Sequence, residues 1–223
     1  MNAKYLFIVF SVPAFFIPGV AAAEGESGSR FQLSAGVALI WLQDSNAYAG
    51  RAGSALEGMG ADMGGGWDSS FKAVPVLTQT WRAHPNISLE LKERFWRYVV
   101  NGAFSFAPDM GYRLEKDVIP VNLLVKFGGF NSSRSFWGGV VVGPGAYVVW
   151  QDEAGRFGSG GSGTYVNAGV HAGGEIVWAV STALNIRFDI SYDWFLTNRT
   201  SRFLGDAGNG GGPSATFGFE FNL

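Results

Sequence analysis

The chain has 223 residues, a formal net charge of −2, 33 glycines, and only 15% charged residues against 15% aromatic ones. The near-neutral charge and the lack of a basic cluster argue against a nucleic-acid partner. There is no cysteine, which excludes disulfides and thiolate metal sites, and two histidines are too few for a histidine-rich site, so we expect neither a metal nor another cofactor.

The first 23 residues have the parts of an export signal. Lys4 gives the positive start, an apolar run broken by two prolines follows, and Ala21 to Ala23 form a small-residue cleavage site. We therefore expect a cleaved signal peptide at residues 1–23 and one mature domain at residues 24–223. The alternative is an uncleaved membrane anchor, for which the apolar run is short. No later stretch is apolar for long enough to predict a transmembrane helix.

The first part of the mature chain contains three predicted strands in which apolar and polar residues alternate. A long loop rich in Gly, Ala and Ser separates the first two, and His84-Pro85-Asn86 is a tight turn between the second and third. Consecutive apolar residues leave the facing of the second strand open, and Glu93 breaks the alternation of the third. These strands are expected at residues 30–43, 71–83 and 87–99.

Five more strands follow. In the first of them the polar residues change from odd to even positions after Pro120, which predicts a one-residue β-bulge there. Connections are long after every odd-numbered strand and short after every even-numbered one, as in an antiparallel up-and-down barrel with all long loops at one end. These strands are expected at residues 111–127, 136–150, 164–178, 182–197 and 214–223.

The strand at residues 182–197 has the clearest two-sided pattern. Its apolar face is unbroken from Leu184 to Trp194, whereas Arg187, Asp189 and their neighbours at odd positions are polar. This length is typical of a strand that crosses a membrane. A sheet can span hydrocarbon only if it closes, so the polar face is expected to line the lumen of a barrel. A soluble β-barrel or sandwich is the alternative, and it would turn its apolar face inward.

The last strand alternates Phe217, Phe219, Phe221 and Leu223 with smaller or polar residues. Together with the paired segments 169–178 and 183–194 and the segment 118–127, it resembles the small eight-stranded outer-membrane barrels of the OmpA, OmpX and OmpW type. The resemblance implies an all-β, eight-stranded antiparallel up-and-down transmembrane β-barrel in the outer membrane of a Gram-negative-type bacterium. It also implies that Phe217, Phe219, Phe221 and Leu223 form the signal that the barrel-assembly machinery reads, although Leu223 stands where the family has an aromatic residue.

The barrel prediction gives two sets of residues. Polar side chains of both signs are expected to form a network in the lumen: Glu90, Lys92, Arg94, Arg113, Glu115, Asp117, His171, Glu175, Arg187, Asp189 and Glu220. Aromatic side chains are expected to form girdles at the two membrane interfaces: Trp41, Tyr98, Tyr112, Trp150, Trp178 and Trp194.

The lumen leaves two functions open. A side-chain-filled lumen predicts a structural or surface-interaction barrel with external partners at loops 45–70, 100–110, 151–163 and 196–213. Alternatively, the inward glycines of residues 139–145 and 169–173 leave room for a narrow channel for small polar or hydrophobic solutes, as in OmpW-type barrels. A lipid-modifying enzyme is disfavoured because no nucleophile accompanies His171 at the spacing that such barrels use. The expected partners are outer-membrane lipid, the barrel-assembly machinery and an external ligand.

Overall fold

The computed structural model describes residues 31–42, 71–104, 107–133, 135–155, 161–196 and 209–223. Within these residues no helix is long and apolar enough to cross a membrane. The predictions for residues 1–23 and 45–70 lie outside the described residues. The described strands are β1 (Phe31–Trp41), β2 (Phe71–His84), β3 (Ile87–Arg94), β4 (Trp96–Phe104), β5 (Ala107–Phe130), β6 (Phe136–Gly155), β7 (Ser162–Ala179), β8 (Leu184–Phe195) and β9 (Gly212–Asn222).

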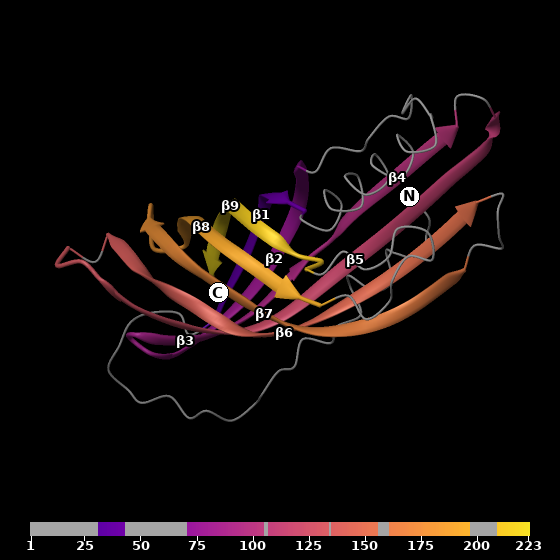
Figure 1. Ribbon diagram of the computed structural model, residues 1–223. Coiled ribbons are helices and arrows are strands. Elements are labelled where there is room, and N and C mark those ends of the chain that lie inside the picture. Colours follow the sequence, from indigo (N-terminus) through magenta and orange to yellow (C-terminus); the bar gives the residue numbers. More distant parts are fainter. Residues whose placement is uncertain (1–30, 43–70, 105–106, 134, 156–160, 197–208) are drawn as a thin grey trace.

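These strands form a closed antiparallel barrel (Figure 1). Strands that follow each other in sequence are paired except β3 and β4, which both pair with β5, and β9 pairs with β1 to close the barrel. Only Phe95 separates β3 from β4, and both pair with β5 in one register, with Glu93 opposite Val121 and Trp96 opposite Val118. We therefore count β3 and β4 as two halves of one wall strand, which confirms the predicted eight-stranded up-and-down barrel.

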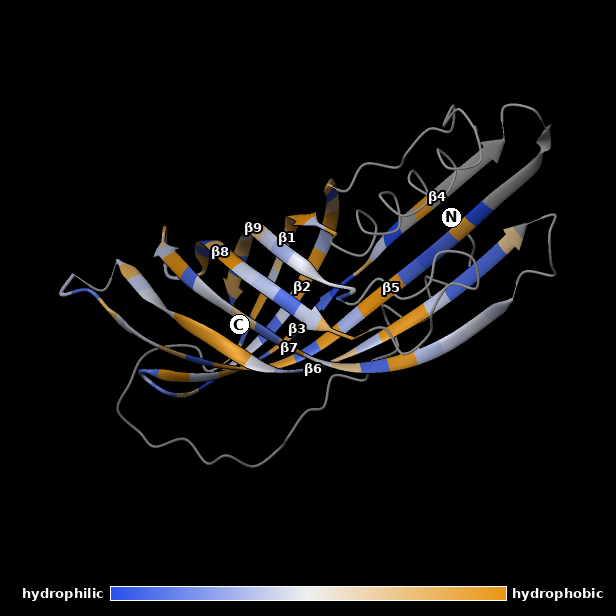
Figure 2. Cartoon of the chain, in the orientation of Figure 1, coloured by the Kyte–Doolittle hydropathy of each residue, from blue (hydrophilic) through white to orange (hydrophobic). Residues whose placement is uncertain are grey.

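Apolar and polar residues alternate along the strands (Figure 2), and the apolar side chains are the exposed ones on the outside of the barrel. On β8, Phe188 is 42% exposed and Ile190 is 60% exposed, whereas Arg187 is 1% exposed and Asp189 is fully buried. A soluble barrel requires the opposite arrangement, because its apolar residues must form the core. The facing of β2, left open by the sequence, is now defined: Thr78 and Thr80 are buried inside, and Leu77 lies on the outer face.

The predicted bulge at Pro120 is wrong. The register between β5 and β6 is unchanged from Lys116 opposite Gln151 to Asn122 opposite Gly145. The polar residues change position for another reason: β5 leaves the apolar zone, so its outer face becomes polar while Leu114 and Val118 fill the lumen.

Two predicted loops are mostly paired strand. β4 continues to Phe104 and β5 starts at Ala107, so most of the predicted loop 100–110 is a hairpin. β6 and β7 likewise reduce the predicted loop 151–163. The hydrogen bonds of a β-ladder join backbone groups, which Gly and Ser carry as well. A Gly- and Ser-rich composition therefore did not show where these strands end. Figure 1 shows the β4–β5 hairpin extending beyond the rest of the wall.

The two ends of the barrel differ. We call the end at which β4 meets β5 and β6 meets β7 the loop end, and the opposite end, with the β2–β3, β5–β6 and β7–β8 connections, the turn end. Toward the loop end the inside of the barrel holds an apolar cluster that includes Ile40, Trp96, Tyr147 and Phe195. Most of the charged lumen residues lie below this cluster, toward the turn end, whereas Lys116 on β5 and Glu153 on β6 are buried nearer the loop end.

Candidate functional site

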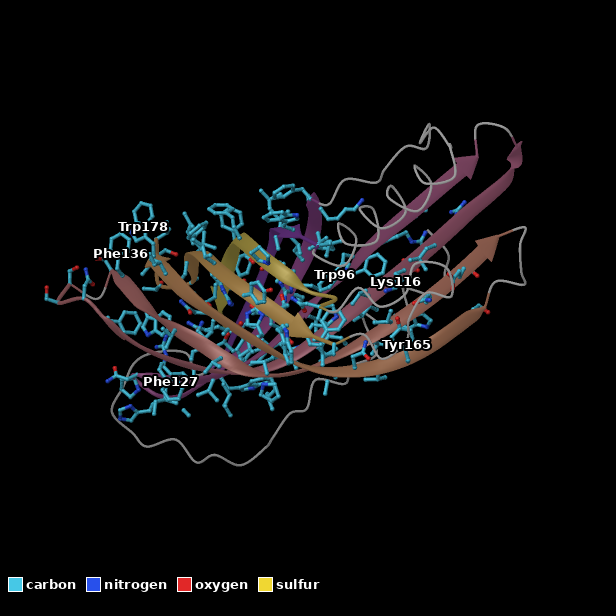
Figure 3. All side chains as sticks on the ribbon, in the orientation of Figure 1. Trp96, Lys116, Phe127, Phe136, Tyr165 and Trp178 are labelled. Carbon is cyan, nitrogen blue, oxygen red and sulfur yellow. The ribbon has the colours of Figure 1, made fainter. Side chains whose placement is uncertain are left out.

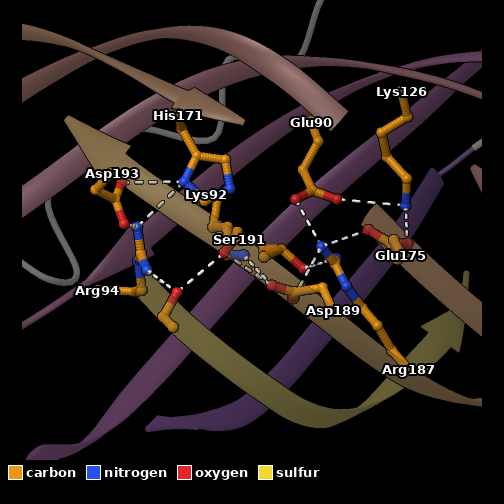
Figure 4. Close-up of polar contacts among 12 residues, drawn as sticks. Glu90, Lys92, Arg94, Lys126, His171, Glu175, Arg187, Asp189, Ser191 and Asp193 are labelled. Carbon is orange, nitrogen blue, oxygen red and sulfur yellow. Dashed lines mark hydrogen bonds and ion pairs between the residues drawn. The ribbon is translucent and has the colours of Figure 1, made fainter. Parts of the chain in front are cut away.

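Two cations share two carboxylates in the middle of the lumen (Figure 4). Arg187 Nη2 lies 2.8 Å from Glu90 Oε1 and 2.8 Å from Glu175 Oε2. Lys126 pairs with Glu175 and lies 3.4 Å from Glu90 Oε2. Arg187 also donates to Thr78 Oγ1 at 2.9 Å. The four charges come from β3, β5, β7 and β8, so they tie together strands around the wall.

A second set of polar contacts continues the network toward the loop end. Lys92 Nζ lies 2.9 Å from Asp189 Oδ1, to which Ser191 Oγ donates at 3.1 Å. The Ser191 hydroxyl lies 3.0 Å from the Ser214 hydroxyl, which accepts from Arg94 Nη1 at 3.2 Å. Side chains of β3, β8 and β9 therefore meet across the lumen.

The network ends at a group of residues around Asp193. Arg94 pairs with one carboxylate oxygen, and the Tyr147 hydroxyl donates to the other at 2.8 Å. His171 Nδ1 lies 3.0 Å from Asp193 Oδ1 and 3.3 Å from Arg94 Nη2. The Tyr147 ring stacks on Phe195 with 4.1 Å between centroids, which joins the polar network to the apolar cluster above it.

The charges of this network balance. Lys92, Arg94, Lys126 and Arg187 supply four cations, and Glu90, Glu175, Asp189 and Asp193 supply four carboxylates, all of them nearly or fully buried. Buried charges are tolerated when each has an opposite partner and hydrogen bonds. The middle of the lumen is thus occupied by a paired network of both signs rather than by a row of like charges.

The inward glycines of β6 and β7 have no room for a larger side chain. A Cβ on Gly145 or on Gly169 would meet the Tyr147 ring, at 2.8 Å and 2.6 Å. A Cβ on Gly139 would meet the Trp137 ring at 2.6 Å, and on Gly143 it would meet the Leu123 carbonyl oxygen at 2.1 Å. These glycines let rings and backbones approach closely, which is the wall-packing use of strand glycine.

The comparisons with known proteins agree with this architecture. No family model and no curated protein matches the sequence. The crystal structure of the outer membrane protein OprG from Pseudomonas aeruginosa is similar, with a TM-score of 0.59 and 12% identity, over 88% of this chain and 97% of that chain. Two others have TM-scores of 0.45: Neisserial surface protein A at 13% identity, over 89% of this chain and 100% of that one, and Ail of Yersinia pestis at 10%, over 87% and 98%.

The fold is that of a small eight-stranded outer-membrane barrel. At these identities the similarity concerns the fold alone, so function must be argued from the residues of this chain.

Eight of the predicted lumen residues lie inside this outer-membrane-type barrel and are almost fully buried: Glu90, Lys92, Arg94, His171, Glu175, Arg187, Asp189 and Glu220. The other three are on the opposite face of β5, because the slip that would have turned them inward is absent. Arg113 is 59% exposed and binds Glu115, and Asp117 accepts two hydrogen bonds from Arg97. Their lumen assignment is therefore corrected.

Sequence reasoning omitted several network residues from its lumen set. Lys126 and Asp193 occupy positions that alternate with outward apolar residues, so the period-two pattern was sufficient to include them. Tyr147 gave no such signal, because residues 146–150 on both faces of β6 are apolar or aromatic.

The predicted girdle residues Trp41, Trp178 and Trp194 point outward and are 42–47% exposed, and Trp150 is on the same face of the wall. Trp41 stacks on Phe71, and Phe136 stacks on Trp178 at the turn end (Figure 3). The side chains of Tyr98 and Tyr112 lie outside the described residues. On β9, the side chains proposed as the assembly signal, Phe217, Phe219, Phe221 and Leu223, are exposed on the outer face.

His171 and the inward serine on the neighbouring strand, Ser191, have different partners. Ser191 contacts Asp189 and Ser214, whereas His171 contacts Arg94 and Asp193, so the two do not form a nucleophile–base pair. Among the residues that the structure describes, no three His, Asp or Glu side chains are grouped so as to hold a metal ion.

Proposed function

We propose that this chain is an integral protein of a bacterial outer membrane, non-enzymatic, with a closed lumen and a structural or surface-interaction role. Its outer face is apolar between two aromatic levels, as lipid contact requires. The observation that carries the closed lumen is the cross-lumen network: Lys92 of β3 reaches Asp189 of β8, although these strands are not neighbours in the wall.

The interaction role is assigned to the loop end. The β4–β5 hairpin extends beyond the apolar zone and exposes Arg97 and Arg113 on its outer face, where an external ligand can reach them. Loops 45–70 and 196–213 are proposed to contribute to the same surface. Exposed Phe217, Phe219 and Phe221 on β9 support the proposal that the barrel-assembly machinery reads this strand.

Single-channel recording in planar bilayers tests the closed lumen. We expect no openings from the wild-type protein once insertion has been verified by heat-modifiable gel migration. A control variant carrying Arg187→Ala, Arg94→Ala and Trp96→Ala removes a long side chain from each level of the lumen and is expected to conduct, which shows that the assay detects a path. Steady openings of the wild-type barrel would contradict the proposal.

A narrow path for small solutes is the second candidate. One observation favours it: the lumen above the charged network is lined by apolar residues such as Ile40, Val76 and Phe195, a surface suited to an apolar solute. Uptake of a small hydrophobic dye into vesicles tests this function. Faster uptake with the barrel than without it, in the absence of any conductance, would favour the narrow path over the closed lumen.

A further inference from the structure

The lipid-facing wall has one polar interruption. In the described strands, outward side chains between the two aromatic levels are apolar or aromatic except for Gln79 on β2 and Glu93 on β3. Gln79 lies opposite Leu91, and Glu93 lies opposite Leu77, so the two are diagonal neighbours on the same face. Leu77 is about midway along β2 between Phe71 and Trp81, and Glu93 lies opposite Val121 on its other side, which places Glu93 within the apolar zone.

Glu93 has an unsatisfied carboxylate oxygen. The residue is 9% exposed, and its Oε1 atom is buried without a hydrogen-bond partner. The charged residues of the lumen are on the other face of the wall. Arg97, further along the same side, is engaged with Asp117 and Glu115.

An unpaired carboxylate is costly in this position. Water is absent from the hydrocarbon layer, so a polar group there is stabilised only by a partner at the same depth. Lipid tails offer no N–H or O–H donor. Gln79 is the nearest donor on the same face of this chain, but no hydrogen bond joins it to Glu93. A second protein surface with a donor at this depth would satisfy the carboxylate.

We propose that the β2–β3 face of this barrel is the contact surface of a homodimer, in which Gln79 of each copy donates its amide N–H to Glu93 of the other. A two-fold contact joins identical patches, so it requires a patch with both a donor and an acceptor, and this pair supplies both. A second copy also brings its donor at the matching depth. Ala35, Ala73 and Pro75 are small outward residues beside the patch, which lets two walls approach closely.

This inference rests on the membrane location proposed above. It also explains why the polar pair is on the outer wall, where neither the lumen network nor the external hairpins can use it.

Cysteine cross-linking in lipid vesicles tests the contact, because the native chain has no cysteine. Leu77→Cys puts one thiol between Gln79 and Glu93, and the matched control Ile190→Cys puts one on β8, 60% exposed and on the far side of the sheet order. On oxidation we expect dimers from Leu77→Cys and about tenfold fewer from Ile190→Cys. Adding Glu93→Leu to Leu77→Cys removes the acceptor and should lower the yield about tenfold, because charged hydrogen bonds are lost.

Equal cross-linking at both sites, or a yield unaffected by Glu93→Leu, overturns the dimer. Vesicle flotation and heat-modifiable migration of the same samples separate the two proposals. An inserted, folded barrel that stays monomeric refutes the dimer alone, whereas a chain that does not enter the vesicles refutes the membrane location and the dimer together.

Discussion

Lys92 Nζ lies 2.9 Å from Asp189 Oδ1, and neither side chain is exposed. The two residues belong to β3 and β8, which do not pair with each other, so the ion pair spans the lumen instead of reinforcing the ladder. Asp189 also lies 3.8 Å from Arg187 and accepts a hydrogen bond from Ser191, so it is the residue that connects the Glu90–Glu175 charges with the Asp193 group.

Removing one member of this pair should destabilise the barrel strongly. In Lys92→Met, Asp189 keeps its Ser191 contact but loses its nearest cation, and we expect a loss of about 3–5 kcal/mol in the free energy of unfolding. The double variant Lys92→Met, Asp189→Leu should recover most of this loss. Urea unfolding in vesicles measures both, and a single-variant loss below about 1 kcal/mol would show that the pair does not act as described.

Gly143 and Gly138 provide a matched test of wall packing. A Cβ on Gly143 would lie 2.1 Å from the Leu123 carbonyl oxygen, whereas a Cβ on Gly138 meets nothing within 4 Å. Gly143→Ala should therefore destabilise the barrel by about 2 kcal/mol or more, because backbone must move, and Gly138→Ala should be neutral or slightly stabilising. Similar stabilities of the two variants, measured by unfolding in the same vesicles, would refute this account of Gly143.

The barrel, and which side chains point outward, could be predicted because apolar outward residues alternate with inward residues throughout the outer wall. From Leu184 to Trp194 every second residue is apolar, and hydrocarbon on one side permits few exceptions. This pattern fails where the lipid ends. On β5 the outer face becomes polar at Asp117, while Leu114 and Val118 face inward, so the polar residues there no longer mark the lumen side, and a bulge was inferred where none exists.

The network could be predicted only as a set of inward charges. Which cation pairs with which carboxylate depends on strands far apart in sequence, such as Arg187 with Glu90, and on side-chain reach that periodicity does not encode. The filled glycine faces were also undetermined, because the ring that covers Gly169 comes from Tyr147 on the neighbouring strand.

Tyr147 stabilises the barrel through its hydroxyl and through its ring, and two substitutions separate these effects. Tyr147→Phe removes the hydrogen bond to Asp193 Oδ1 but keeps the ring over Gly145 and Gly169, so a loss of about 1–2 kcal/mol is expected. Tyr147→Ala also removes the stack on Phe195 and leaves a cavity, for a loss of about 3–5 kcal/mol. Equal losses in urea unfolding would mean that the ring contributes nothing beyond its hydroxyl.

Charge placed on the outer face should reveal the membrane directly. Ile190 and Val180 are 60% and 52% exposed, but Ile190 is midway along β8, whereas Val180 lies in the turn between β7 and β8. In a membrane, Ile190→Lys should cost about 2–4 kcal/mol and Val180→Lys about 0–1 kcal/mol, because a lysine at the rim reaches water and one at the midplane does not. In water both substitutions replace an exposed apolar residue by a solvated charge, and neither should cost much. The two variants, unfolded by urea in vesicles, therefore measure whether lipid contacts this wall. Equal stability of Ile190→Lys and Val180→Lys would contradict the assignment of β8 as a membrane-spanning strand.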